Sequence, residues 1–115
     1  MNYDQAARTR RSLVGMRAGL AAFYTQVAAT IDQLGESDPQ AAFTLASEHQ
    51  DALRSLHDQE ENRASRLRAR QAARIRDKEA LSLAGLADRI GVSKSRADQL
   101  VNLAKQRQEQ VEATP

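Results

Sequence analysis

The 115-residue sequence has no cysteine or tryptophan and only two phenylalanines and two tyrosines. Without cysteine, neither a disulfide framework nor a thiolate metal site can form. So few aromatic side chains cannot fill a large globular core, which favours a thin core spread along helices and completed by a partner chain. Glycine and proline are also scarce, and the abundant residues are good helix formers. The composition therefore predicts an all-α protein.

Long apolar runs are absent as well. Arg, Gln or Thr interrupts each apolar run within a few residues, far short of a membrane span. The first residues, MNYDQAARTRRS, lack the apolar stretch of a signal peptide. We therefore expect a cytoplasmic protein that makes no membrane contact. The formal net charge is only +2, so any electrostatic attraction for a partner depends on where the charges lie.

Residues 4–34 have the apolar periodicity of a helix that packs along one seam. Small residues flank this stripe and would let a neighbouring helix approach closely. Gly19 lies in the middle of the segment, where it costs on the order of 1 kcal/mol relative to alanine unless close packing requires it. The stripe consists of Leu13, Met16, Leu20, Phe23, Val27, Ile31 and Leu34.

The segment LGESDPQ separates this helix from a second one. Gly35 suits the left-handed residue after a helix end, Asp38 can cap the next helix, and Pro39 suits its first turn. We expect the second helix to run from Pro39 to about Lys78. The apolar residues of its first half can pack antiparallel against the first helix; they are Phe43, Ala46, Leu53 and Leu56.

The residues LAGLADRIGVSKSRADQLVN, at positions 83–102, carry the strongest signal. A helix-turn-helix needs a small residue where its helices cross, a turn residue that tolerates positive φ, and apolar residues between the helices. Ala87 is the small residue and Gly91 the turn residue. Ser82 can cap a helix from Leu83 to Ile90, and Ser93 can cap a last helix from Lys94 to about Gln110. The apolar set is Leu86, Ile90, Val92, Ala97 and Leu100.

The stretch GVSKSRADQL resembles the recognition half of helix-turn-helix regulators, and most closely that of bacterial sigma factor region 4. The similarity covers only residues 81–104. It implies that Lys94, Ser95 and Gln99 contact base edges and that Arg96 contacts phosphate. Asp98 stands where that family usually has a basic residue.

Helical spacing leads to the same face without the family. Ser93, Lys94, Ser95, Asp98, Gln99 and Asn102 lie opposite Ala97 and Leu100. In a major groove, Lys94 can donate to guanine, and Gln99 or Asn102 can bind adenine bidentately. Arg89 and Lys105 are placed to reach phosphates, which fix register but carry no sequence information.

Residues 63–78 hold seven basic side chains against one acid, Asp77. One interpretation is a solvated helix whose arginines pair with the acids Asp58, Glu60 and Glu61 of a partner. The other is that Arg70, Arg74 and their neighbours lie against the DNA backbone, which the position next to the motif favours.

Candidates for catalysis and metal binding are weak. His49 and His57 are eight positions apart, which does not fit metal ligands on one helix. No glycine-rich phosphate loop, Ser/His/Asp order or cysteine nucleophile occurs, and nothing desolvates the paired Glu60 and Glu61. We expect a protein that is not an enzyme and needs neither a metal nor a cofactor.

These patterns together predict a coiled-coil-like helical hairpin followed by a C-terminal helix-turn-helix. The expected function is sequence-specific binding of double-stranded DNA by a homodimeric transcriptional regulator, or by a plasmid or phage maintenance protein. An alternative is a helical docking protein, for example one that contacts RNA polymerase. The predicted parts are a dimerising hairpin (1–62), a basic connector (63–79), the DNA-binding unit (80–110) and a frayed tail (111–115).

Overall fold

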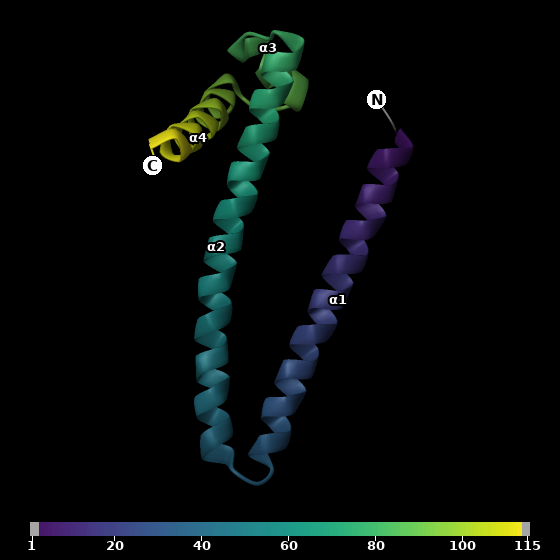
Figure 1. Ribbon diagram of the computed structural model, residues 1–115, viewed down its shortest axis with the longest axis vertical. Helices are drawn as coiled ribbons and strands as arrows, with labels where there is room; N and C mark the ends of the chain where they lie inside the picture. Colours follow the sequence, from purple (N-terminus) through teal and green to yellow (C-terminus); the bar gives the residue numbers. More distant parts are fainter. Residues whose placement is uncertain (1–2, 114–115) are drawn as a thin grey trace. The chain divides into compact units, whose positions relative to one another are not determined.

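The chain is all-α, as its composition predicts (Figure 1). The computed structural model describes the backbone of residues 3–113 and the side chains of residues 3–106. Among these residues there is no strand, and the helices begin and end within three positions of the expected ones. Their bounds are Tyr3–Gly35 for α1, Pro39–Glu79 for α2, Leu83–Ile90 for α3 and Lys94–Ala113 for α4.

The end of α4 lies beyond the expected position. The helix continues to Ala113, although the sequence analysis placed a frayed tail from residue 111 onward. No glycine or proline interrupts residues 94–113, so nothing in this stretch forces an earlier end. Residues 114 and 115 of the predicted tail lie outside the described residues.

The chain divides into two compact units, residues 1–54 and 55–115, and α2 contributes to both. The first unit, which we call the hairpin unit, contains α1 and the start of α2. The second, which we call the head unit, contains the rest of α2 together with α3 and α4. The division falls eight residues earlier than the expected end of the hairpin at residue 62.

The turn between α1 and α2 confirms the predicted cap at Asp38 and contradicts the conformation predicted for Gly35. Asp38 Oδ1 accepts a hydrogen bond from the backbone N–H of Ala41 at 3.1 Å, as expected for a helix cap. Gly35 is the last residue of α1 and does not have a positive φ, so its predicted left-handed role is wrong. An added Cβ would lie 3.4 Å from the Cβ of Ala42, so the glycine instead permits a close approach of the two helices.

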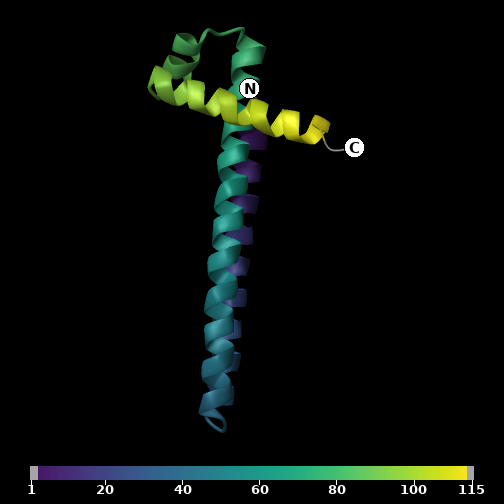
Figure 2. The ribbon, with the colours of Figure 1, turned by 90° about the vertical axis from the view of Figure 1, so that its left-hand side faces the viewer.

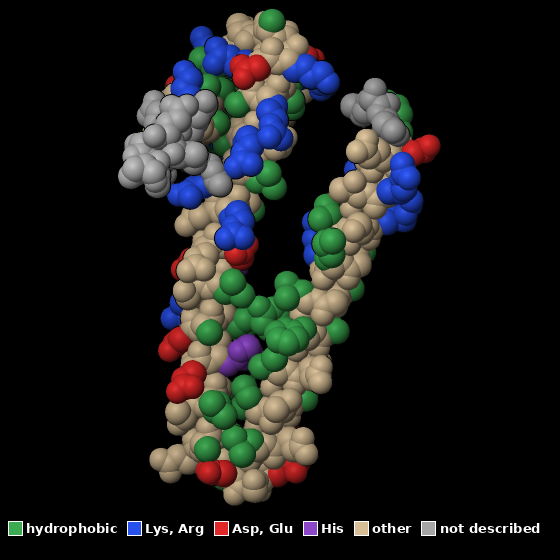
Figure 3. Space-filling model, in the orientation of Figure 1, with side chains coloured by type: hydrophobic (Ala, Val, Ile, Leu, Met, Phe, Trp, Pro, Cys, Tyr) green, Lys and Arg blue, Asp and Glu red, His purple; other side chains and the backbone are tan. Residues whose placement is uncertain are grey.

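Much of the apolar stripe of α1 is exposed within the chain. Its second half is partly covered: Val27, Ile31 and Leu34 are half-buried, and the ring of Tyr24 lies 6.1 Å from that of His49 on α2. Figure 3 shows apolar side chains between the two helices near the loop. The first half of the stripe is more exposed. Between 44% and 66% of the surface remains exposed there, at Leu13, Met16, Leu20 and Phe23.

The core of the head unit is built from three helical segments. The last turns of α2 provide Ala69 and Ala72, which cluster with Leu100 of α4, and α4 crosses this part of α2 (Figure 2). A neighbouring cluster joins Leu86 and Ala87 of α3 to Ala97 and Val101 of α4, with Ile75 of α2 against it. The end of the segment expected to be a connector is therefore part of the core.

Alanine at the contact points explains why so small a core is fully packed. Ala69 and Ala97 are completely buried, and a side chain with no atoms beyond Cβ lets helix backbones approach closely. Leu86 and Leu100 then fill the space between the three segments and are the largest fully buried side chains of the described residues. Because the cluster is small, each of these leucines carries a large share of the apolar burial.

We expect Leu86→Ala to lower the free energy of unfolding of the head unit by about 2–4 kcal/mol, because it empties a fully buried site. Leu67→Ala is the matched control, since Leu67 is 52% exposed on α2 and should cost less than about 1 kcal/mol. Amide hydrogen exchange in α3 and α4 measures both. Equal effects of the two truncations would contradict this core.

Candidate nucleic-acid interface

Helices α3 and α4 and the turn between them have the three local features that the sequence predicts. Ser82 Oγ accepts from the backbone N–H of Gly85 at 3.1 Å, and Ser93 Oγ accepts from that of Arg96 at 3.0 Å. Gly91 has φ 74° and ψ 38°, the left-handed conformation that suits glycine. Its N–H and that of Val92 both donate to the carbonyl of Ala87, at 2.9 and 3.0 Å. The bonds of Gly91 and Val92 end α3, and the Ser93 cap starts α4, all within residues 91–93.

The predicted reading face of α4 is open to solvent, while the opposite face is packed. Ala97, Leu100 and Val101 are buried against α2 and α3. The helical period then turns the polar positions outward. All of them are exposed: Ser93, Lys94, Ser95, Arg96, Asp98, Gln99 and Asn102.

Two side chains on this face contact each other. Arg96 Nη1 donates a hydrogen bond to Gln99 Oε1 at 3.3 Å, one helical turn further along α4. The sequence suggests separate roles for these residues and does not predict their contact. Asp98 lies between them in sequence but pairs with no basic side chain among the residues that the structure describes. The Asp98 carboxylate would therefore repel a nearby phosphate, or it could accept a hydrogen bond from the amino group of a base.

Arg89, expected to reach a phosphate, forms an ion pair with Glu79. Arg89 Nε lies 3.2 Å from Glu79 Oε1, and both side chains are substantially exposed. An exposed pair contributes at most about 1 kcal/mol, so it orients the arginine more than it stabilises the fold. The remaining guanidinium N–H groups can still donate to a phosphate.

A second feature that sequence reasoning missed holds the end of α2 in place. Ala80 has a positive φ of 52°, the backbone N–H of Leu81 donates to the carbonyl of Arg76, and that of Ala80 donates to Asp77. This is the bonding pattern of a Schellman motif, with alanine where glycine is usual. Arg76 Nε donates in turn to the carbonyl of Leu81 at 3.2 Å. Arg76 therefore stabilises the end of α2. An alanine at position 80 gives no sign of this turn in the sequence.

The other arginines of residues 63–78 are placed differently. Arg70 is half-buried, Arg74 is exposed and donates to Gln71 Oε1 at 3.2 Å, and Arg63 lies 3.7 Å from Glu60. Arg63, Arg66, Arg70 and Arg74 recur at helical spacing and form one stripe, which we call the arginine stripe. Lys and Arg side chains gather over this part of α2 and around α3 in Figure 3.

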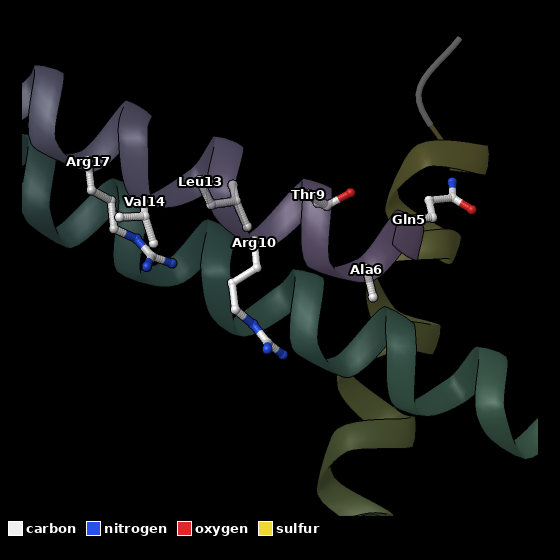
Figure 4. A pocket seen from close by; sticks show the side chains of 7 residues that line it. All are labelled: Gln5, Ala6, Thr9, Arg10, Leu13, Val14 and Arg17. Atoms are coloured by element: carbon white, nitrogen blue, oxygen red, sulfur yellow. The ribbon is translucent and has the colours of Figure 1, made fainter. Parts of the chain in front are cut away.

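The first half of α1 carries basic side chains beside its exposed apolar residues. A shallow open hollow there is lined entirely by α1, and Arg10 and Arg17 project from the same side of the helix as Val14 (Figure 4). No acidic residue occurs between Asp4 and Asp32. This face is therefore both apolar and basic.

The histidines and acids of α2 do not form a metal site. His57 Nε2 lies 3.2 Å from Glu61 Oε2, and His49 packs near the ring of Tyr24. Throughout the described residues, no three His, Asp or Glu side chains gather as metal ligands would. No helix of the described chain is long and apolar enough to cross a membrane.

Comparison of the chain with models of protein families, with curated proteins and with solved structures gives no significant match. The similarity to sigma factor region 4 therefore rests on residues 81–104 alone.

We expect Ser93→Ala to weaken the first turn of α4 by about 1 kcal/mol, because it removes the acceptor for the backbone N–H of Arg96. Faster hydrogen exchange at the Arg96 amide measures the change. Ser95→Ala is the matched control, since this neighbouring serine is exposed and does not cap the helix. If both variants exchange alike, the cap does not hold the start of α4.

Proposed function

We propose that this protein is a sequence-specific double-stranded DNA-binding protein, acting as a homodimeric transcriptional regulator. In this proposal α3 and α4 form a helix-turn-helix, and α4 lies in the major groove. The end of α2 is the third helix of the DNA-binding unit.

One observation carries the proposal: α4 is held by an apolar face and presents an unobstructed polar face. Ala97, Leu100 and Val101 fix the helix, so the backbone positions that carry its outward side chains are set before DNA binds. Ordinary surface helices also have polar faces. This one differs because it follows a tight Gly91 turn and begins with an uncharged cap and then Lys94. Its N-terminal residues are those that recognition helices place against base edges.

The side chains on that face match the chemistry of base edges. Lys94 donates to guanine O6 or N7, and Gln99 or Asn102 offers the donor and acceptor that adenine requires. Ser93 caps the helix through an oxygen lone pair, so its hydroxyl hydrogen can still bond a phosphate. Asp98 can accept from a cytosine amino group.

Phosphate contacts come from the surrounding arginines. Arg96 and Arg89 lie at the start of α4 and the end of α3, and Arg70 and Arg74 belong to the arginine stripe on α2. Each phosphate that is neutralised releases counterions, so affinity falls as salt rises. We include Arg70 and Arg74 among the phosphate contacts because basic side chains cluster on this part of α2. Such contacts contribute affinity rather than specificity.

The exposed stripe of α1 supports the homodimer. A monomer would leave Leu13, Met16, Leu20 and Phe23 in water along a helix that has no buried residue. Exposed apolar surface of this extent marks an interaction site. A second copy that covers it would bring two heads to half-sites one or more helical turns apart, at about 34 Å per turn.

For DNA binding, we expect the double variant Arg96→Ala, Gln99→Ala to lose retention of duplexes selected from random DNA, with the oligomeric state unchanged. Both side chains are exposed, so their removal leaves the core intact. Electrophoretic mobility shift measures retention. The matched control is Gln59→Ala, Asn62→Ala, which changes two polar residues on α2 outside the predicted DNA contacts.

Full retention by the Arg96, Gln99 variant, or failure of the wild type to bind any duplex, would favour the docking alternative. The apolar and basic face of α1 is the observation on which that alternative rests.

For the homodimer, we expect Leu20→Glu with Phe23→Glu to dissociate the protein, because charges would then occupy the apolar seam. Sedimentation gives the mass. Ala22→Glu with Thr25→Glu adds the same charge, with the same three-residue spacing, to the exposed face of α1 opposite the stripe and should leave the dimer intact. An unchanged mass for the first variant would refute this interface.

A further inference from the structure

The hydrogen bond between Arg96 and Gln99 joins the residue expected to contact phosphate to one expected to contact a base. Arg96 Nη1 lies 3.3 Å from Gln99 Oε1, and the backbone N–H of Arg96 is itself held by the Ser93 cap at 3.0 Å. The backbone of Arg96 is therefore fixed at the start of α4, and its guanidinium group reaches Gln99 from there. Both side chains are exposed and no other hydrogen bond of Gln99 is seen among the described residues.

The chemistry of this pair allows only one orientation of the glutamine amide. A guanidinium group has five N–H donors and no acceptor, so only the amide oxygen can face it. The amide NH2 group of Gln99 must then point away from Arg96. An exposed glutamine without such a partner turns its amide freely and offers a donor or an acceptor in either direction.

We propose that Arg96 is a positioning residue that sets the base specificity of Gln99 for adenine; this inference rests on the proposed DNA-binding function. With the amide fixed, Gln99 Nε2 donates to adenine N7. The second lone pair of Oε1 accepts from adenine N6, while the first remains with Arg96. Contact of the same guanidinium with a phosphate ties this orientation to the register of α4 on the duplex.

The fixed amide disfavours the other purine and both pyrimidines. In the major groove guanine presents two acceptors, so Oε1 would face guanine O6 without a hydrogen between them. Cytosine presents a donor and thymine an acceptor, and each satisfies only one end of the amide. If Arg96 is removed, the amide can rotate to suit these bases one bond at a time, and the preference for adenine falls.

The test uses the full-length protein and four duplexes, which differ only at the base pair where Gln99→Ala abolishes discrimination. We expect the wild type to prefer adenine there by about 5- to 100-fold, the usual range for one bidentate contact. Arg96→Met should reduce this ratio severalfold and leave it above that of Gln99→Ala, because a rotating amide can still bind adenine through both its atoms. Arg96→Lys keeps a donor without an acceptor and should restore most of the ratio.

Lys94→Met is the matched control, because it removes a cation from the same turn of α4 without removing the bond to Gln99. It should weaken binding to all four duplexes and keep the adenine ratio. If Arg96→Met instead weakens all four equally and keeps the ratio, Arg96 contacts phosphate only and the positioning role is wrong. If the wild type discriminates at no base pair, the proposed function fails and this role fails with it.

Discussion

Close packing through alanine is the constraint on which the head unit depends. Ala69 and Ala72 on α2, Ala87 on α3 and Ala97 on α4 occupy the points where the helices meet. Larger side chains at these points would push the helices apart and open the space that Leu86 and Leu100 now fill. The buried face of α4 packs against α2 and α3 in one position, so the polar face of α4 has one orientation relative to these helices. In the proposed function this fixed orientation of the α4 backbone lowers the entropic cost of binding.

The parts of this unit that are local in sequence could be predicted. Ser82, Ser93 and Gly91 each act on backbone groups within five residues, so short-range rules place them correctly. Asp38 was predicted for the same reason. Gly35 was misassigned because a glycine after an apolar stripe has two possible uses, a left-handed turn or a close contact. The φ of Gly35, which is not positive, and the nearby Cβ of Ala42 distinguish them.

What depends on packing or on side-chain direction could not be predicted. Residues 63–79 look like a charged connector because arginines outnumber the few small residues, yet Ala69, Ala72 and Ile75 lie on the side that meets α3 and α4. Among the arginines, Arg76 turns inward to the carbonyl of Leu81, whereas Arg74 bonds Gln71 on the surface. A count of charges in the sequence does not distinguish Arg76 from Arg74. The pairings of Arg96 with Gln99 and of Arg89 with Glu79 likewise arise from geometry.

The proposed function requires that the polar face of α4 enters the major groove. Methylation interference on a selected duplex tests it most directly, because methylation of guanine N7 alters only that groove. We expect that N7 methylation within the selected site blocks binding, and that the block at a guanine contacted by Lys94 disappears in Lys94→Met. Binding that tolerates methylation at every guanine N7, but is blocked by modification of adenine N3 in the minor groove, would contradict it.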